Sequence, residues 1–274
     1  MSRIDNAIES AAQKRSQGGA GPTADPFSLP KVDQGRKLPK YGDGVATNLS
    51  NPFLVTANDQ NSPAAEQYRK LKSLIVQLSQ LGNFDKALMV TSSGPGEGKT
   101  ITSLNLAITM AQEFDHTVLL VEADIRKPAI LNYLGIKAQR GLSDCVIDGL
   151  DVRDALVKTD LGNLSILPAG KHVENPVELF SSKKMSALFA EIQDRYNDRY
   201  VIVDTTPLLP FAEPQYIAKA IGAVLLVVRE GMTTPEKVKR SLEMLKGNTL
   251  LGVVNNCVSR VNSMDGYYGY YGYR

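Results

Sequence analysis

The strongest constraint on the fold is a regular alternation of apolar strands with amphipathic helices. Near-continuous apolar runs, typical of strands, stand at 86–93, 116–124, 164–170, 200–207, 222–230 and 249–256. Helical spacing of apolar residues appears at 62–81, 99–114, 185–198 and 234–246. Strands that are apolar throughout are buried on both faces, as in parallel sheets covered by their connecting helices. The sequence therefore predicts an α/β fold, a mostly parallel sheet with helices on both faces.

Changes in local composition divide the chain into three parts. Residues 1–62 are predicted to be a flexible leader, with one short amphipathic helix near the start and a linker rich in Gly, Pro, Lys and Asp at 16–52. Ser62 and Pro63 then form a helix-start signal. The folded domain is predicted at 63–260, followed by a tyrosine-rich tail at 261–274.

Composition excludes several classes of function. A net charge of +2 over 274 residues argues against nucleic acid as a partner. The N-terminus lacks the apolar core of a secretory signal, and the longest apolar run, 220–228, is too short to span a bilayer and is predicted to be a buried strand. Two isolated cysteines and two isolated histidines favour neither a disulfide framework, nor a zinc site, nor a Ser-His or Cys-His mechanism.

A phosphate-binding loop follows the first predicted strand. The stretch "SSGPGEGKT" at 92–100 opens a helix and fills a Walker A frame, with Ser93 in place of the first glycine. Its glycines let backbone N–H groups wrap a phosphate, and the helix adds the positive end of its dipole. The predicted ATP-binding residues here are Gly94, Pro95, Gly96, Glu97, Gly98, Lys99, Thr100 and Ile101.

This loop makes the predicted fold P-loop NTPase-like and implies ATP and Mg²⁺ as ligands. Lys99 reaches the β- and γ-phosphates, and the hydroxyl of Thr100 can ligate Mg²⁺. An ordinary turn is the alternative, but strand, glycine-rich loop and helix rarely stand in that order by chance.

Acidic residues close two other predicted strands. "VLLVEADIRKP" brings Glu122, Asp124 and Arg126 to a strand end, and "VIVDTTP" brings Asp204 to another. Ligands of open parallel sheets bind beyond the carboxyl ends of the strands, and a buried carboxylate needs a cation there. Asp204 is therefore predicted to hold Mg²⁺ as a Walker B acid. Glu122 has an alternative role, capping a helix or pairing with Arg126 or Lys127.

The three motifs "SGPGEGKT", "VLLVEADIRKP" and "VIVDTTP", with the tail "YYGYYGY", resemble the bacterial tyrosine kinases that control capsular and exopolysaccharide synthesis. The resemblance covers about 63–274. It implies that Lys99, Glu122, Asp124 and Asp204 are catalytic. It also implies that Thr100, Asp124 and Asp204 organise the metal.

In that family the second motif reads D-x-D-x-R, and its first acid is thought to take the proton of the incoming tyrosine. Here Glu122 stands at the first place, so the division of roles between Glu122 and Asp124 stays open. Arg126 and Asn256, the latter at the end of the last strand and near the adenine, complete the implied ATP site.

A charged triplet in the first helix resembles the family's E-x-x-R-x-x-R subunit contact. It consists of Glu66, Arg69 and Lys72, with lysine in place of the last arginine. Spacing of three keeps the charges on one helical arc. A solvated charged face is the alternative, and the resemblance implies a homo-oligomeric ring.

The tail holds the predicted phosphorylation sites. Tyrosines alternate with glycine there, at Tyr267, Tyr268, Tyr270, Tyr271 and Tyr273. A disordered tail or an aromatic docking tag is the alternative. A parallel last strand would release the tail on the phosphate-loop side, and the eleven residues from Asn256 to Tyr267 reach up to ~36 Å.

The resemblance thus implies an ATP-dependent protein tyrosine autokinase that regulates polysaccharide polymerisation and export. Implied partners are a membrane-embedded co-polymerase as activator, further copies of the chain, and a tyrosine phosphatase. Its expected place is the cytoplasm, at the inner face of the plasma membrane through that partner. The rival resemblance is to partitioning and division-site ATPases of Min and Par type, acting as nucleotide switches. Those carry a loop lysine where Gly94 stands here.

Overall fold

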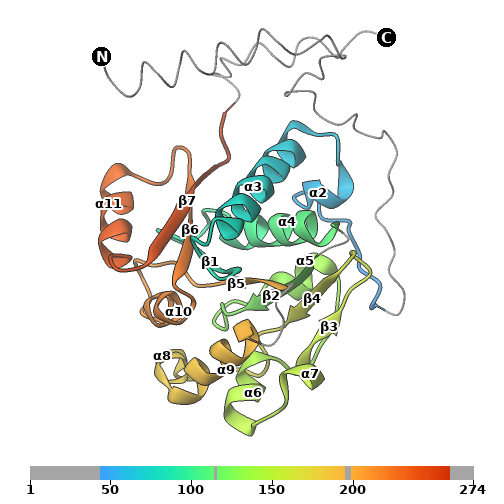
Figure 1. Ribbon diagram of the computed structural model, residues 1–274, viewed down its shortest axis with the longest axis vertical. Coiled ribbons are helices and arrows are strands. Elements are labelled where there is room, and N and C mark those ends of the chain that lie inside the picture. Colours follow the sequence, from blue (N-terminus) through green and yellow to red (C-terminus); the bar gives the residue numbers. More distant parts are fainter. Residues whose placement is uncertain (1–43, 114–115, 195–198, 260–274) are drawn as a thin grey trace, which may run out of the picture. The chain divides into compact units, whose positions relative to one another are not determined.

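The computed structural model describes residues 44–113, 116–194 and 199–259 (Figure 1). The predicted N-terminal helix, most of the predicted linker and the five tail tyrosines lie outside these ranges.

One sheet organises the described residues. Its seven strands there are β1 (Ala87–Ser92), β2 (Thr117–Glu122), β3 (Val157–Lys158), β4 (Leu164–Leu167), β5 (Arg199–Asp204), β6 (Ala223–Arg229) and β7 (Thr249–Asn256). Their spatial order is β3-β4-β2-β5-β1-β6-β7. All neighbouring pairs are parallel except β3 with β4. The predicted mostly parallel α/β sheet is confirmed.

Helices cover both faces of the sheet (Figure 1). The layer that packs with α4 consists of α2 (Val55–Asn58), α3 (Pro63–Gln80), α4 (Lys99–Ala111) and α5 (Ile130–Leu134). The opposite layer consists of α6 (Leu142–Asp148), α7 (Val152–Ala155), α8 (Pro176–Ser181), α9 (Lys183–Asp194) and α10 (Glu213–Ile221). A last helix, α11 (Pro235–Met244), connects β6 to β7.

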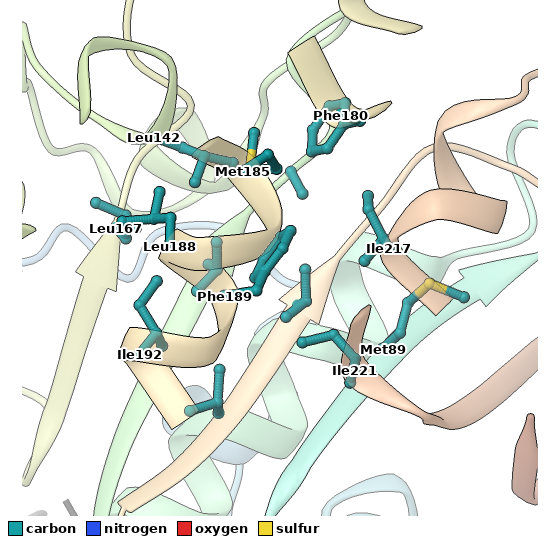
Figure 2. Close-up of a cluster of buried hydrophobic side chains, with 14 of the residues drawn as sticks. Met89, Leu142, Leu167, Phe180, Met185, Leu188, Phe189, Ile192, Ile217 and Ile221 are labelled. Atoms are coloured by element: carbon teal, nitrogen blue, oxygen red, sulfur yellow. The ribbon is translucent and has the colours of Figure 1, made fainter. Parts of the chain in front are cut away.

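Apolar side chains join the second layer to the sheet. Figure 2 shows helices α9 and α10 meeting strand β1 in this core, through Met185, Leu188, Phe189, Ile192, Ile217, Ile221 and Met89. Burying each such side chain contributes about 1.5–3 kcal/mol. The strands below them are therefore held rigidly enough to place functional groups at their ends.

The structure corrects the prediction of one strand through 220–228. Helix α10 ends at Ile221, Gly222 follows with φ of +82°, and strand β6 begins at Ala223. The apolar run contains the end of a helix and the start of a strand. Gly222, with its positive φ, ends the helix, but a glycine does not interrupt an apolar stretch of sequence.

Part of the predicted leader packs on the folded unit. Val45 donates its N–H to the carbonyl of Lys158 at 2.9 Å, and Leu54 is completely buried. The side chain of Asn105 in α4 binds the backbone of both Phe53 and Thr56. The fold thus begins before residue 63, since Leu54 stands directly before helix α2 and the backbone around it is bound by α4.

Candidate active site

Three functional strand ends are neighbours in the sheet. Strands β2, β5 and β1 lie side by side, and Glu122 pairs in register with Asp204. The predicted phosphate loop follows β1, and α4 begins at Lys99. The topology therefore gathers all three sequence motifs at the carboxyl edge of the sheet, where ligands of such folds bind.

The turn into α4 depends on Gly98. This residue precedes the helix with φ of +96°, a conformation that favours glycine. A Cβ atom at this position would collide with the side-chain nitrogen of Asn256. Gly98 is thus required both by the backbone conformation and by the close approach of β7.

Lys99 pairs with an acid from the neighbouring motif. Its Nζ lies 2.8 Å from Oδ2 of Asp124, and both side chains are largely buried. Burial by itself lowers the pKa of Lys99, but the carboxylates of Asp204 and Asp124 outweigh it, so the net pKa is raised. The lysine is therefore a permanently charged group at the end of the phosphate loop.

Asp204 binds the start of α4 through hydroxyl groups. Its Oδ2 accepts from Thr100 Oγ1 at 2.8 Å, and its Oδ1 accepts from Ser103 Oγ at 3.0 Å. Burial raises the pKa of Asp204 to about 6, although nearby Lys99 and the two hydroxyl groups act in the opposite direction. A cation beside this carboxylate would remove the cost of burying its charge.

The pair of Thr100 and Asp204 fits Mg²⁺. This ion prefers hard oxygen ligands, uses one or two carboxylates, and keeps water and phosphate oxygens in its remaining positions. Among residues 44–113, 116–194 and 199–259, no three His, Cys, Asp or Glu side chains form a metal-binding group. Because phosphate oxygens can fill the remaining positions of Mg²⁺, the pair suits a metal held jointly with phosphates. Asp124, also predicted for the metal, pairs with Lys99, and its contact with a metal stays a prediction.

Glu122 anchors the start of helix α5. Its Oε1 accepts from the N–H of Ala129 at 2.5 Å and from the N–H of Ile130 at 2.7 Å. The helix-capping role, one of the two predicted alternatives, is thus present. Burial raises the pKa of Glu122, partly offset by these N–H groups. The residue also lines a cavity of about 170 Å³, together with residues of α5 and of the segment after β4.

Arg126 contacts the start of helix α10. Its guanidinium pairs with the buried Glu213 at 2.6 Å and lies 4.8 Å from the centre of the Phe211 ring. This contact joins the segment after β2 to the start of α10. The predicted contact of Arg126 with ATP stays a prediction.

Asn256 lies against the phosphate loop. Its Nδ2 donates to the carbonyl of Glu97 at 3.0 Å, and its Oδ1 accepts from the N–H of Cys257 at 2.9 Å. Because β7 is parallel to β6, the end of β7 stands at the same edge as the loop. The predicted contact of Asn256 with adenine stays a prediction.

Known proteins match both the sequence and this geometry. An AAA domain family model matches residues 85–233. The tyrosine-protein kinase YwqD of Bacillus subtilis is 32% identical over 221 residues, which cover 80% of this chain and 91% of YwqD. The solved kinase domain of the Escherichia coli tyrosine kinase Etk is 28% identical with a TM-score of 0.70, over 81% of this chain and 86% of that domain.

The chain belongs to the bacterial tyrosine-protein kinase family. The resemblance predicted from the three motifs is confirmed. The septum site-determining protein MinD of Pyrococcus horikoshii matches with a TM-score of 0.51 at 20% identity, which shows the fold alone. The rival resemblance therefore holds only for the P-loop fold that both groups share.

The charged triplet of this kinase-family member is engaged within the chain. Arg69 pairs with Glu66 at 2.5 Å and donates to the carbonyl of Gln60, and Lys72 pairs with Glu113 at 2.6 Å. A role of the triplet in a ring stays a prediction. Within the described ranges, no helix has the length and apolar character needed to cross a bilayer.

Four residues that bind predicted site residues were not themselves predicted from the sequence. Ser103 binds Asp204, Glu213 binds Arg126, Thr233 binds the side chain of Glu97, and Arg229 binds the carbonyl of Gly96. Ser103 could have been found, because it lies one helical turn after Lys99 and Thr100 and so faces the same side. Glu213 and Thr233 belong to no motif, and only the tertiary structure brings them to the site.

Proposed function

We propose that this chain is an ATP-dependent protein tyrosine kinase that phosphorylates tyrosines of its own C-terminal tail. The meeting of Lys99, Thr100, Asp124 and Asp204 at one edge of the sheet carries the proposal. A buried cation, two carboxylates and a phosphate loop are the groups that phosphoryl transfer requires.

In this proposal the loop amides and Lys99 bind the phosphates of ATP. Lys99 exchanges its pairing with Asp124 for the transferring phosphate, where it offsets the charge that develops. Thr100 and Asp204 would hold Mg²⁺, with Asp124 nearby. When bound, this ion neutralises phosphate charge and orients the γ-phosphoryl group.

Glu122 is the proposed proton acceptor. Its Oε1 is fixed by two N–H groups of α5, and the residue borders a cavity into which a phenol could enter. The phenol oxygen forms the new bond to the γ-phosphorus as the bond to the β–γ bridging oxygen breaks. ADP leaves with that oxygen, and the phenol proton passes to Glu122.

The tail is the proposed substrate because it continues from β7, whose end lies at the phosphate-loop edge. Its candidate sites are Tyr267, Tyr268, Tyr270, Tyr271 and Tyr273. We propose that transfer occurs between copies in a ring that uses Glu66, Arg69 and Lys72. Each added phosphate brings roughly −1.5 to −2 charge, so a multiply phosphorylated tail would repel itself and leave its neighbour.

The family membership also motivates the proposed setting. This chain would act in capsule or exopolysaccharide synthesis, at the cytoplasmic side of the membrane. A membrane-embedded co-polymerase would activate it, and a tyrosine phosphatase would reverse the modification. The proposed folded domain ends near residue 260, where the tail begins.

A mixing experiment with purified protein, ATP and Mg²⁺ tests the proposal. One chain carries Lys99→Met and an intact tail, and the other is active but has its five tail tyrosines replaced by Phe. We expect phosphotyrosine on the Lys99→Met chain. If only wild type is labelled, at a rate independent of concentration, transfer occurs within one chain.

Wild-type protein that forms no phosphotyrosine under these conditions contradicts the kinase proposal itself. Light scattering then compares the unphosphorylated and phosphorylated forms. We expect a smaller assembly after phosphorylation, and equal masses would contradict the proposed loosening of the ring.

A further inference from the structure

The phosphate loop carries an acidic side chain of its own. Glu97 stands inside the loop, and its residue surface is only 1% exposed. A buried carboxylate is costly unless it accepts hydrogen bonds, and near phosphates it also repels them. Its place in the loop therefore calls for a structural benefit that outweighs the repulsion.

Both oxygens of Glu97 accept hydrogen bonds. Oε2 accepts from the N–H of Gly94 at 2.9 Å, which closes the loop on itself. Oε1 accepts from the hydroxyl of Thr233 at 2.6 Å. That hydroxyl accepts in turn from the N–H of Arg229 at 2.9 Å, so its single proton is available for Glu97. The carboxylate is thus tied to the turn between β6 and α11.

The backbone carbonyls of the loop are held from the same side. Arg229 Nη1 donates to the carbonyl of Gly96 at 3.1 Å, and Asn256 Nδ2 donates to the carbonyl of Glu97 at 3.0 Å. Arg229 and Asn256 are register partners at the ends of β6 and β7. The ends of two neighbouring strands therefore bind two successive peptide units of the loop through hydrogen bonds.

These two hydrogen bonds determine the direction of the loop N–H groups. In a planar trans peptide, the C=O of one residue and the N–H of the next point in opposite directions. Holding the carbonyls of Gly96 and Glu97 toward β6 and β7 turns the N–H groups of Glu97 and Gly98 away from those strands. Inward-pointing N–H groups are what a phosphate loop uses to bind its anion.

We propose that Glu97, Arg229, Thr233 and Asn256, here called the loop clamp, are positioning residues that aim the amides of the phosphate loop at the nucleotide phosphates. The inference rests on the proposed function, since it requires that the loop binds ATP. It adds that part of the affinity for phosphate comes from a turn that no sequence motif contains.

Thr233 is the residue to test, because it lies outside the phosphate loop and its hydroxyl donates to Glu97. Thr233→Val keeps the shape of the side chain and removes the hydroxyl. The substitution also removes the acceptor of the Arg229 N–H. We expect Mg-ATP to bind about tenfold more weakly, chiefly because the hydrogen bond to the charged Glu97 is lost. Thr233→Ser restores the hydroxyl and should bind like wild type.

Thr234→Val is the matched control in the same turn. The Thr234 side chain caps α11 by accepting from the N–H of Lys237, so its loss should leave the binding of Mg-ATP unchanged. Calorimetry with magnesium pyrophosphate provides a second arm. Because the clamp acts on phosphate-binding amides, Thr233→Val should weaken pyrophosphate and ATP by the same factor.

The inference is overturned if Thr233→Val binds both ligands like wild type, or if Thr233→Ser or Thr234→Val loses affinity equally. It is also overturned if only ATP binding weakens, which would indicate a contact with the nucleoside. A wild-type chain that binds neither ligand is a distinct result, since it contradicts the proposed function as well.

Discussion

The two sides of the phosphate loop differ in chemistry. On one side, the acidic flank of Glu122, Asp124 and Asp204 surrounds Lys99 with buried charges. On the other side, the loop clamp holds the loop through hydrogen bonds. Arg229 and Asn256 each donate to one loop carbonyl, and the Thr233 hydroxyl donates to the Glu97 carboxylate. One side therefore supplies charge for the reaction, and the other supplies geometry for binding.

This difference predicts a graded series of substitution effects. Charges in a dry site interact strongly, and groups that contact a transition state dominate its stabilisation. Single hydrogen bonds to a backbone contribute about 0.5–1.5 kcal/mol each. Substitutions on the acidic side should thus reduce turnover far more than substitutions in the loop clamp reduce binding.

Lys99→Met should have the largest effect. It removes the cation that the loop places at the transferring phosphate, so we expect tyrosine phosphorylation to fall by about a thousandfold or more. Antibody detection of phosphotyrosine measures the loss, and an unchanged circular dichroism spectrum shows that the fold persists. Normal labelling of this variant would contradict the assignment of the phosphate loop.

Glu122→Gln separates proton transfer from helix capping. The amide oxygen can still accept from the N–H groups of Ala129 and Ile130, so α5 should keep its anchor while the side chain loses its basicity. We expect phosphotransfer to fall by ~10²–10⁴-fold with Mg-ATP affinity retained. Turnover equal to that of wild type would leave Glu122 with the capping role alone.

Asn256→Ala, a substitution in the loop clamp, should have a moderate effect on Mg-ATP affinity. It removes the donor to the carbonyl of Glu97, so we expect affinity for Mg-ATP to fall by about five- to tenfold. If Asn256 also contacts adenine, ATP will lose more affinity than pyrophosphate does. Equal losses would assign the residue to the loop clamp only.

Arg229→Gln should have the smallest effect. The guanidinium is exposed, and a solvent-exposed polar contact is worth at most about 1 kcal/mol. We expect Mg-ATP binding to weaken by less than about fivefold, as measured by calorimetry. If calorimetry showed a larger loss of Mg-ATP affinity for Arg229→Gln than for Lys99→Met, the proposed division between the acidic flank and the loop clamp would be reversed.

Much of the site could be predicted from local sequence because its parts are contiguous. The loop at 92–100 stands between a strand and a helix, and the acids at 122, 124 and 204 close apolar strands. In a parallel sheet such strand ends share one edge, so order along the chain was sufficient to predict that Lys99, Asp124 and Asp204 lie at the same site.

Other features could not be predicted, because their partners are far apart in the chain. Leu54 is buried against distant helices and strands, although the sequence around it predicted a flexible leader. The pairing of Arg126, a predicted ATP-binding residue, with Glu213 joins residues 87 positions apart. Short helix α10 lacked a distinctive pattern, and its apolar end merged with that of β6.

The sequence by itself determined the fold class, the phosphate loop and the family, since periodicity and contiguous motifs need only neighbouring residues. Tertiary structure alone decided which partner each of these functional side chains contacts. It directed Asp124 to Lys99, anchored Glu122 on α5, and brought Thr233 to Glu97 across 136 positions. Those choices depend on which strand ends and turns become neighbours, and hydrogen bonds between them form only when the sheet has assembled.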